Sequence, residues 1–436
     1  MNEKLKIVKT FISMRYFRKF KTREKLEKYQ KKMLLKQLRY IKENSEYFKD
    51  IKTDSADDLQ LLPIMDKKTM MDNFNKLNCV GIDRDTALEI AINGEKNRKF
   101  DEKLNNISVG LSSGTSGARG LFIINDDERV MWAGTVLARF LPRKNIFGHK
   151  IAFFLRADNN LYETIDSKAI KFRYFDIMKD MNENIETLNN YQPTIIVAPP
   201  SVLLILAEAQ KNNKITVNPV KIVSVAEVLT SKDEQYLKKI FNLEIIHQAY
   251  QCTEGFLGYV CECGNFHMNE DVVYIEKEYI DEERFVPIIT DFLRKSQPII
   301  RYRLNDILIE DKKRCPCGSS CLVIKKIEGR EDDIFIFEGK KEKEVTVFPD
   351  FISRCIIYSH GIKNYKVVQK DEHNIVVYLD YINEEIKEQI SKEFQALSQK
   401  MNFVCPKISF EKYEFILSKK MKRVERLKKP LPHTKF

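Results

Sequence analysis

The segment LSSGTSGARG, residues 111–120, combines three glycines with four hydroxyl side chains and leads into an apolar run at 121–124. Glycine lets the main chain approach a ligand closely, and amide N–H groups and hydroxyls are natural partners of phosphate oxygens. A flexible Gly/Ser surface loop is the alternative. No lysine followed by Ser or Thr comes after the second glycine, so a Walker-type NTPase is disfavoured. The segment predicts a phosphate-binding loop with the candidate cofactor-binding residues Ser112, Ser113, Gly114, Thr115, Ser116 and Gly117.

Length and composition describe a soluble globular protein. The 436 residues are enough for two or three domains, with 43% hydrophobic and 31% charged residues. The longest apolar stretch, 195–209, contains Pro199 and Pro200 and is shorter than the roughly 20 residues of a membrane span. The basic, amphipathic N-terminus lacks an uninterrupted apolar core and a small-residue cleavage site. We therefore expect no transmembrane helix, no secretory signal and a cytoplasmic location.

Positive charge predominates. Lys and Arg number 74 against 63 Asp and Glu, a net charge of +11, and much of the excess lies in residues 1–50 and 412–431. Such a balance suits a nucleotide, coenzyme A, an acidic carrier protein, RNA or a membrane surface. No aromatic-interleaved RNA-binding signature accompanies the basic runs, so we expect no nucleic-acid partner.

Five of the nine cysteines form two clusters, CECGNFH at 261–267 and CPCGSSC at 315–321. Clustered cysteines in an intracellular chain suggest a metal before a disulfide, and tetrahedral zinc takes Cys and His. Reduced or buried thiols are the alternative, and whether Cys321 takes part stays open. The clusters predict a structural Zn²⁺ site with the candidate ligands Cys261 or Cys263, His267, Cys315 and Cys317.

The order of predicted elements indicates an α/β protein. Residues 1–60 have helical apolar spacing, and strands are predicted at 151–155, 194–198, 221–225 and 244–250. Helices lie between them at 201–213 and 231–242, and a capping box of Ser231 and Glu234 is predicted to open the second. This alternation predicts a mainly parallel sheet covered by helices, with ligands beyond the carboxyl ends of its strands.

The pattern changes near residue 330. The remainder predicts a helix at 350–359, strands at 364–369 and 374–380, a helix at 383–400, a strand at 407–411 and then a basic tail. We therefore expect a large N-terminal domain, residues 1–330, whose residues 1–60 are helical, and a small α+β domain, residues 331–436.

Downstream of LSSGTSG, three further strings follow in a fixed order: AYQCTEG (249–255), PIIRYRLND (298–306) and IEGREDD (327–333). Together with LSSGTSG and LPIMDKK (62–68), they resemble the adenylate-forming superfamily, and within it the phenylacetate-coenzyme A ligase and F390 synthetase-like (CapK-type) branch. The resemblance implies a large domain of mainly parallel sheets flanked by helices and a small mobile α+β domain. It also implies use of ATP and Mg²⁺ to activate a carboxylic acid.

The resemblance assigns roles to single residues. Tyr250 would stack on adenine, Thr253 would contact phosphate and Glu254 would bind Mg²⁺ through a hard oxygen. Asp306 would accept hydrogen bonds from the ribose hydroxyls, and Arg330 would approach the ribose or a phosphate. An ordinary surface ion pair is the alternative for each charged residue.

The chain departs from the family pattern at three points. Arg119 is the local cation where the common glycine loop continues with Pro-Lys, and Asn305 stands where glycine usually precedes the aspartate. Asparagine tolerates a left-handed turn better than other non-glycine residues. In the tail, KKMKRV resembles the family's GKAKRV loop, which puts Lys419 at the glycine and Lys420 at the catalytic lysine. That lysine would contact the α-phosphate and the attacking carboxylate, and would leave when the small domain rotates about a hinge near Asp332.

The predicted reaction has two steps: acid and ATP form an acyl adenylate and pyrophosphate, and an acceptor then displaces AMP. By resemblance the acceptor is coenzyme A first, the phosphopantetheine of an acyl carrier protein second and an amine third. Residues 224–227 and 250–257 would line an acyl pocket suited to an aryl or short aliphatic acid. The rival predictions are a nucleotide-binding regulatory protein without the chemistry, and a basic RNA-binding or membrane-surface protein. A homodimer is left open.

Overall fold

The computed structural model describes residues 3–97, 102–111, 120–155, 170–341, 343–357, 362, 364–414 and 421–427. Residues 112–119 of the glycine-rich segment, together with Lys419 and Lys420, lie outside the described residues. The roles predicted for them stay predictions. No helix in the described ranges combines the length and the apolar composition that crossing a bilayer requires.

The chain divides into two compact units. Unit 1 comprises residues 1–279, 286–304 and 310–326, and unit 2 comprises residues 280–285, 305–309 and 327–436. Unit 2 therefore includes two short segments that precede residue 327 in the sequence. The domain boundary predicted at residue 330 stays a prediction.

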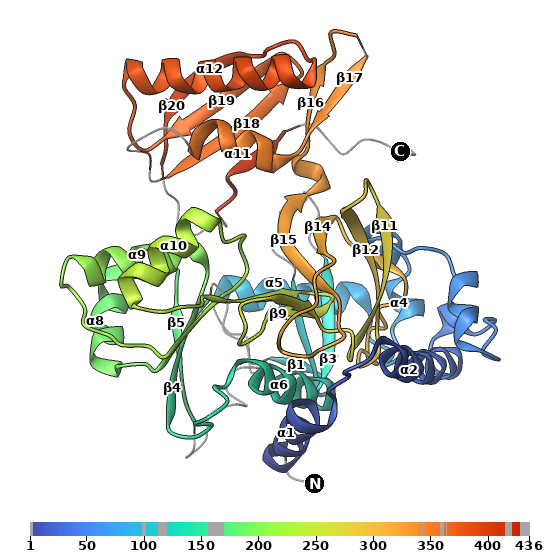
Figure 1. Ribbon diagram of the computed structural model, residues 1–436. Helices are drawn as coiled ribbons and strands as arrows, with labels where there is room; N and C mark the ends of the chain where they lie inside the picture. Colours follow the sequence, from blue (N-terminus) through green and yellow to red (C-terminus); the bar gives the residue numbers. More distant parts are fainter. Residues whose placement is uncertain are drawn as a thin grey trace. The chain divides into compact units, whose positions relative to one another are not determined.

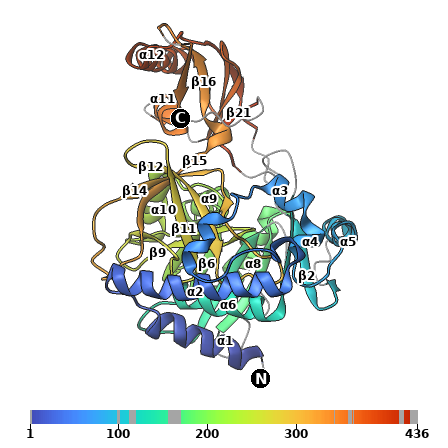
Figure 2. The ribbon, with the colours of Figure 1, turned by 90° about the vertical axis from the view of Figure 1, so that its right-hand side faces the viewer.

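Helices dominate the N-terminal part of unit 1. The first helix lies beside α6 (Asp126–Phe140), as Figures 1 and 2 show. Leu34, Leu38 and Ile41 are buried on one side of the second helix, as their spacing predicts. The helical elements are α1 (Glu3–Ile12), the π-helical turn η1 (Ser13–Phe17), α2 (Arg23–Asn44), the 3-10 turns η2 (Glu46–Phe48) and η3 (Ala56–Leu61), α3 (Lys67–Asp72), α4 (Phe74–Leu77) and α5 (Arg84–Asn97).

The glycine-rich segment connects two strands of a small antiparallel sheet. Its members are β1 (Lys103–Leu104), β2 (Ile107–Leu111) and β3 (Leu121–Asn125), in the order β1-β2-β3. Leu111 is the register partner of Leu121, so both ends of the connecting segment leave the sheet at the same place.

A twelve-stranded mixed sheet, ordered β11-β12-β14-β15-β10-β9-β8-β7-β6-β4-β5 with β13 beside β12, forms the centre of the fold. The strands from β5 to β8 are parallel, and β8 pairs with β9 in antiparallel fashion. The α/β prediction is confirmed. The strands are β4 (His149–Leu155), β5 (Ile170–Asp176), β6 (Ile195–Ala198), β7 (Lys221–Ser224), β8 (His247–Cys252), β9 (Gly255–Val260), β10 (Phe266–Met268), β11 (Val273–Tyr279), β12 (Arg284–Asp291), β13 (Tyr302–Arg303), β14 (Asp306–Asp311) and β15 (Val323–Arg330).

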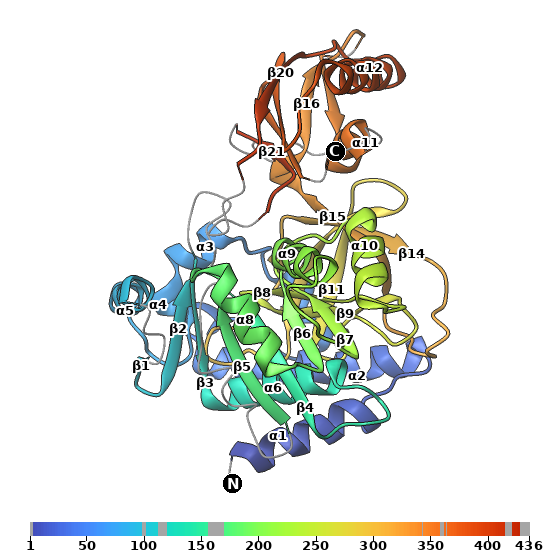
Figure 3. The ribbon, with the colours of Figure 1, turned by 90° about the vertical axis from the view of Figure 1, so that its left-hand side faces the viewer.

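Helices cover the parallel strands. α8 (Met181–Tyr191), α9 (Pro200–Lys211) and α10 (Ser231–Phe241) lie beside β4–β7 in Figure 3. One core cluster joins α1 and α6 to this sheet through Ile7, Val130, Ala133, Leu137, Ile151 and Ile195. The hydrophobic residues that define the elements thus bury the sheet between helices, as an α/β fold requires.

Two local predictions near α10 are wrong. Thr230, not Ser231, caps the helix, because its hydroxyl accepts the Asp233 N–H at 3.2 Å while Ser231 is already helical. The strand predicted at 244–250 begins at His247 and continues to Cys252. It extends further because its last residues pair with β9 across a tight turn.

Unit 2 contains a four-stranded sheet, ordered β20-β19-β18-β21, beside two helices. The basic tail was predicted without secondary structure, but Val424 is buried and pairs in parallel with Val367. The tail therefore includes a strand. The elements are β16 (Phe335–Glu338), β17 (Glu344–Val347), α11 (Pro349–Ile357), β18 (Tyr365–Asp371), β19 (Asn374–Leu379), α12 (Glu384–Met401), β20 (Lys407–Lys412) and β21 (Val424–Arg426).

Candidate active site

A two-residue turn, Thr253–Glu254, joins β8 to β9 and carries the AYQCTEG motif. Gly255 allows close packing there, because a Cβ would lie 2.9 Å from Oδ2 of Asp291. The guanidinium of Arg294 donates hydrogen bonds to the carbonyl oxygens of Thr253 at 2.9 Å and Ile123 at 3.2 Å. The turn is therefore tied to β3, the strand that follows the glycine-rich segment.

The Glu254 carboxylate accepts a hydrogen bond from Thr253 Oγ1 at 2.9 Å. The phenol of Tyr302 lies close enough for the charge of Glu254 to act on it: burial first, and then this negative charge, raise the pKa of Tyr302. Sequence reasoning missed Tyr302, although the residue lies within the RYRLND motif.

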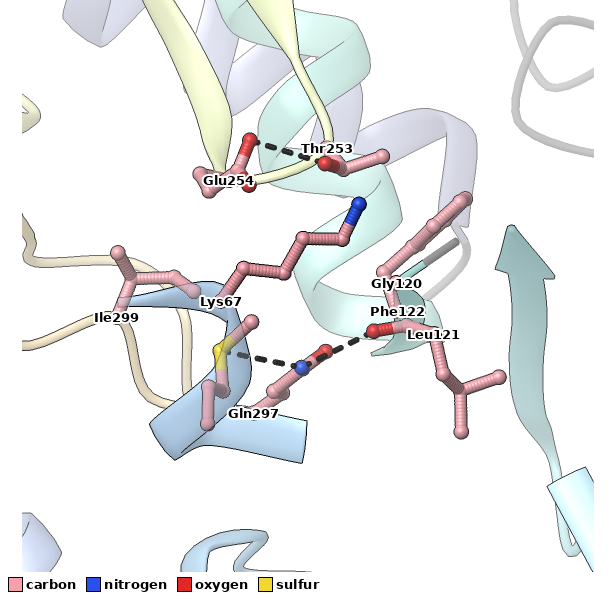
Figure 4. Close-up of a pocket in the computed structure, with 9 residues that line it drawn as sticks. Lys67, Gly120, Leu121, Phe122, Thr253, Glu254, Gln297 and Ile299 are labelled. Atoms are coloured by element: carbon pink, nitrogen blue, oxygen red, sulfur yellow. Dashed lines mark hydrogen bonds between the residues drawn. The ribbon is translucent and has the colours of Figure 1, made fainter. Parts of the chain in front are cut away.

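A small open pocket lies beside this turn (Figure 4). Three motifs meet in it: the end of the glycine-rich segment, the Thr253–Glu254 turn and the PIIRYRLND string. Gln297, directly before this string, joins it to β3, because it accepts the Ile123 N–H at 3.0 Å and donates to the Leu121 carbonyl at 3.3 Å. The lining residues are Lys67, Met70, Gly120, Leu121, Phe122, Thr253, Glu254, Gln297 and Ile299.

Lys67 brings a cation into this pocket, with its side chain extending toward the Thr253–Glu254 turn in Figure 4. It is the first residue of α3, which Asp66 caps by accepting the Thr69 N–H at 2.7 Å. Met65 N–H donates to the Arg301 carbonyl at 2.9 Å, which holds the preceding segment in place. Sequence reasoning missed this role, although it noted the LPIMDKK motif.

The carboxyl end of β7 carries a strained turn. Ala226 has φ +67°, a left-handed conformation that costs about 1–2 kcal/mol for a residue with a Cβ. The Glu227 carboxylate accepts both the N–H and the hydroxyl of Ser201 at 3.1 Å, at the N-terminus of α9. Backbone strain of this kind clusters at functional sites. The acyl-pocket role of residues 224–227 stays a prediction.

Tyr250, predicted to stack on adenine, lies in β8 three residues before the turn. It pairs with Gly258 of β9 and is 6% exposed. Stacking requires one ring face to be accessible to the nucleotide. The adenine contact therefore stays a prediction.

Within unit 2, two further predicted site residues lie next to each other. Arg330 Nε is 3.4 Å from Asp306 Oδ1. Asn305 donates to Asp332 Oδ2 at 2.9 Å, and its carbonyl accepts the Glu331 N–H at 2.8 Å. Asn305 is not among the described residues with positive φ, so it joins the two motifs by hydrogen bonds rather than by a left-handed turn.

The C-terminal motif is anchored near the predicted hinge. Lys422 Nζ is 2.5 Å from Oδ1 of Asp333, also within unit 2. Burial raises the pKa of Asp333 to about 6, and the charges of Lys422 and Arg330 oppose this shift. The ion pair and strand β21 hold the chain on the C-terminal side of Lys420.

The cysteine clusters converge in unit 1. One ligand atom from each of Cys261, His267, Cys315 and Cys317 lies within 4.8 Å of the others. Cys261 Sγ is 3.6 Å from Cys315 Sγ, and Cys317 Sγ is 3.4 Å from His267 Nε2. Tetrahedral zinc, with Zn–S bonds of about 2.3 Å and Zn–N bonds of about 2.0 Å, separates such atoms by about 3.8 and 3.5 Å. The four residues therefore fit zinc.

The two Cys-x-Cys-Gly turns have the same conformation. Cys263 N–H donates to Cys261 Sγ, and Cys317 N–H donates to Cys315 Sγ, both at 3.4 Å. The following Gly264 and Gly318 both have φ +78°, which favours glycine. Each N–H donor would stabilise a thiolate on the first cysteine of its turn.

The four clustered side chains include one of the two cysteines of the 261–263 pair. Cys261 belongs to this set, whereas Cys263 is exposed and outside it. Cys321 is also outside it. The interaction between the two thiols lowers the pKa of Cys317 and raises that of Cys261.

No family model matches the chain. Protein CapK of Staphylococcus aureus is 24% identical over 374 residues, which cover 82% of this chain and 78% of that protein. Indoleacetate--lysine synthetase of Pseudomonas savastanoi is 26% identical over 135 residues, covering 30% of this chain and 33% of that protein. This chain is thus similar to CapK over most of its length.

The solved structure of 2-hydroxyisobutyryl-CoA ligase in the postadenylation state, in complex with 2-HIB-AMP, aligns with a TM-score of 0.69 at 15% identity. The alignment covers 93% of this chain and 89% of that one. The chain has the fold of the adenylate-forming ligases. The amide bond synthetase McbA from Marinactinospora thermotolerans shares this fold over 73% of this chain and 68% of its own, with a TM-score of 0.53 at 12% identity.

Proposed function

We propose that this protein is an adenylate-forming ligase, which converts a carboxylic acid and ATP into an acyl adenylate and pyrophosphate. The observation that carries the proposal is the pocket shared by the end of the glycine-rich segment, the Thr253–Glu254 turn and Lys67. The fold of the adenylate-forming ligases and the similarity to CapK support it.

The pocket supplies both kinds of group that a Mg²⁺-bound triphosphate needs. Glu254 offers a carboxylate for the metal, which would neutralise phosphate charge, and Lys67 offers a cation for phosphate oxygens. Hydroxyl groups of residues 112–116 and Arg119 would add donors from the neighbouring loop. Lys67 therefore extends the sequence prediction, in which Arg119 was the local cation.

The remaining roles rest on the resemblance. Asp306 would hold the ribose and Arg330 the ribose or a phosphate, while Tyr250 would stack on adenine. Lys420 would approach the α-phosphate as the acid oxygen attacks in line. Lys422 and β21 support this proposal, since they anchor the motif two residues after Lys420.

Coenzyme A is the favoured acceptor, because a CoA ligase shares the fold over nearly the whole chain. A carrier-protein phosphopantetheine is the second thiol candidate. An amine is the alternative that a specific observation favours, because Indoleacetate--lysine synthetase and the amide bond synthetase McbA are both similar to this chain. The acid is an aryl or short aliphatic one by resemblance, and the cytoplasmic location and a homodimer stay predictions.

Zinc in the Cys/His cluster would be structural. Four protein ligands close a tetrahedral site and leave no position for substrate. The metal would join the β9–β10 connection to the loop before β15.

Pyrophosphate release by the purified protein tests the proposal, with ATP, Mg²⁺ and a panel of aryl and aliphatic acids. Acid-dependent release supports a ligase, whereas nucleotide binding without release for any acid would support the regulatory alternative. Adding coenzyme A, a phosphopantetheinylated carrier or lysine to the active mixture then distinguishes the acceptors. Glu254→Gln serves as the inactive control.

A further inference from the structure

Exposed apolar side chains gather near the N-terminus. Of the fifteen large apolar side chains exposed in the described residues, five lie between residues 5 and 17. The last of them is 79% exposed. From residue 5 to residue 16 their spacing is three or four, which places them on one side of a helix. We call this set the apolar stripe; it consists of Leu5, Val8, Ile12, Tyr16 and Phe17.

The opposite side of α1 is anchored on α6. Ile7 is buried in the core shared by the two helices. They approach so closely that a Cβ at Gly134 would lie 2.6 Å from Thr10 Cβ. Arg15 donates to the carbonyl oxygens of Ala138 at 3.1 Å and Leu141 at 2.7 Å, at the end of α6. Since these contacts fix the rotation of α1 about its axis, the apolar stripe lies on the exposed side of this segment, opposite the buried Ile7.

Two ion pairs strengthen this anchoring. Arg129 of α6 is 2.7 Å from Glu3, and Lys6 is 2.5 Å from Asp127. Both lie along the contact between the helices, so the polar side chains of the inner side are used within unit 1. Within the described residues, the apolar stripe stays exposed.

Basic side chains surround the apolar stripe. Lys9, Lys19 and Lys21 are exposed along this segment. Burial and then the positive charges of Arg143 and Arg15 lower the pKa of Lys19, with smaller contributions from Arg139 and Lys21. These positive charges disfavour the charged form of Lys19, which indicates a surplus of positive charge around it. The surface is thus suited to an anionic partner.

We propose that the apolar stripe docks unit 1 on an anionic bilayer surface, with its apolar side chains in the headgroup region and Lys9, Lys19 and Lys21 against lipid phosphates. A helix with apolar and aromatic residues on one side and lysines beside them is the pattern of interfacial helices. A second copy would bring two positive surfaces together, which opposes self-association. Nucleic acid would leave the apolar side chains without a partner. An anionic bilayer accommodates both the apolar side chains and the lysines of this surface.

Vesicle sedimentation with the full chain tests this proposal. The vesicles contain phosphatidylglycerol and phosphatidylcholine, or phosphatidylcholine alone, at low and high salt. We expect binding to the anionic vesicles that weakens in high salt. Leu5→Ser/Val8→Ser/Phe17→Ser should lower the partition coefficient at least tenfold. The matched control Leu61→Ser/Val220→Ser/Tyr381→Ser, which changes three exposed apolar side chains elsewhere, should leave it unchanged.

A second variant tests how much the lysines contribute to vesicle binding. Lys9→Glu/Lys21→Glu should lower the partition coefficient by at least about 30-fold, since one lysine near an anionic bilayer contributes about fivefold. Lys179→Glu/Lys214→Glu makes the same change of net charge at other exposed lysines. The logarithm of its partition coefficient should fall by less than half as much. Every variant should have the melting temperature of the parent chain, which confirms that it is folded.

Three results would overturn the proposal. The full chain could fail to bind anionic vesicles, or could bind them equally well after the apolar stripe is changed. A dimer in solution that the stripe substitutions abolish would assign the surface to a second copy instead.

Discussion

The Cys/His cluster and the Glu254 pocket are assembled in opposite ways. The cluster takes its four ligands from two seven-residue stretches, 261–267 and 315–321, and brings them within 4.8 Å of one another. The pocket takes its lining from separate segments between residues 67 and 299 and stays open. A closed set of soft ligands stabilises a fold, whereas an open set of charged groups can bind a substrate.

Because of this difference, we expect substitutions at the two sites to affect different properties of the protein. Loss of a cluster ligand should lower stability with little effect on chemistry. Loss of a pocket residue should lower the rate of adenylation with little effect on stability. The first four predictions below test that separation.

Glu254→Gln is expected to have the largest effect. It keeps the size of the side chain but removes the charge proposed to bind Mg²⁺, and we expect acid-dependent pyrophosphate release to fall on the order of 10²–10³-fold, as when a group that stabilises charge in the transition state is lost. The melting temperature should not change. A variant with undiminished release would exclude Glu254 from the mechanism.

Lys420→Ala separates the two half-reactions. Loss of a cation from a water-poor site should cost roughly 3–4 kcal/mol of barrier, or about 10²–10³ in the adenylation rate. Conversion of supplied acyl adenylate by the acceptor should persist, since the lysine is proposed to leave before that step. Lys422→Ala is the comparison, because it removes the ion pair with Asp333 rather than the proposed catalytic group. Equal loss of both half-reactions in Lys420→Ala would indicate a folding defect.

Lys67→Ala should raise the KM for Mg·ATP by about 10- to 100-fold, because a hydrogen bond to a charged group contributes about 1.5–3 kcal/mol. The neighbouring Lys68→Ala is a matched control, since Lys68 is exposed on the same short helix and does not line the pocket. The measurement is initial-rate kinetics at saturating acid. Identical KM values for the two variants would place the phosphate cation elsewhere.

We expect the parent protein to hold about one zinc per chain, and Cys315→Ser should reduce this content and lower the free energy of unfolding. We expect a loss of roughly 2–5 kcal/mol, the range seen when a native cross-link is removed. Cys263→Ser is the control and should change neither, because Cys263 is exposed and outside the ligand set. Elemental analysis and denaturant unfolding provide the readouts. Metal-free parent protein, purified without chelators, would refute the zinc site.

Ala226→Gly is expected to have the smallest effect. Glycine adopts φ +67° without the clash of a Cβ, so the free energy of unfolding should rise by about 1 kcal/mol. Denaturant unfolding measures the change. A decrease in stability would show that neighbouring contacts of the Ala226 methyl group outweigh its backbone strain.

Prediction from sequence was most accurate where interactions are local. The α/β pattern predicted the parallel strands β4, β6 and β7 nearly to the residue. The Thr230 cap was missed because two adjacent hydroxyl residues can each cap a helix, and only the backbone conformation distinguishes them. The C-terminal strand β21 was missed because a short run of basic residues resembles a solvated end until Val424 is buried.

The sequence by itself determined the ligand types and spacing of the two Cys-x-Cys-Gly turns, the glycine-rich segment and the order of the motifs. Such features depend on residues a few positions apart, whose geometry the backbone constrains. Only the tertiary structure decided that Lys67 and Tyr302 lie with Glu254, that Cys263 stands outside the cluster, and that the apolar stripe faces outward. Contacts between residues far apart in the sequence depend on strand order and helix packing, which local spacing does not specify.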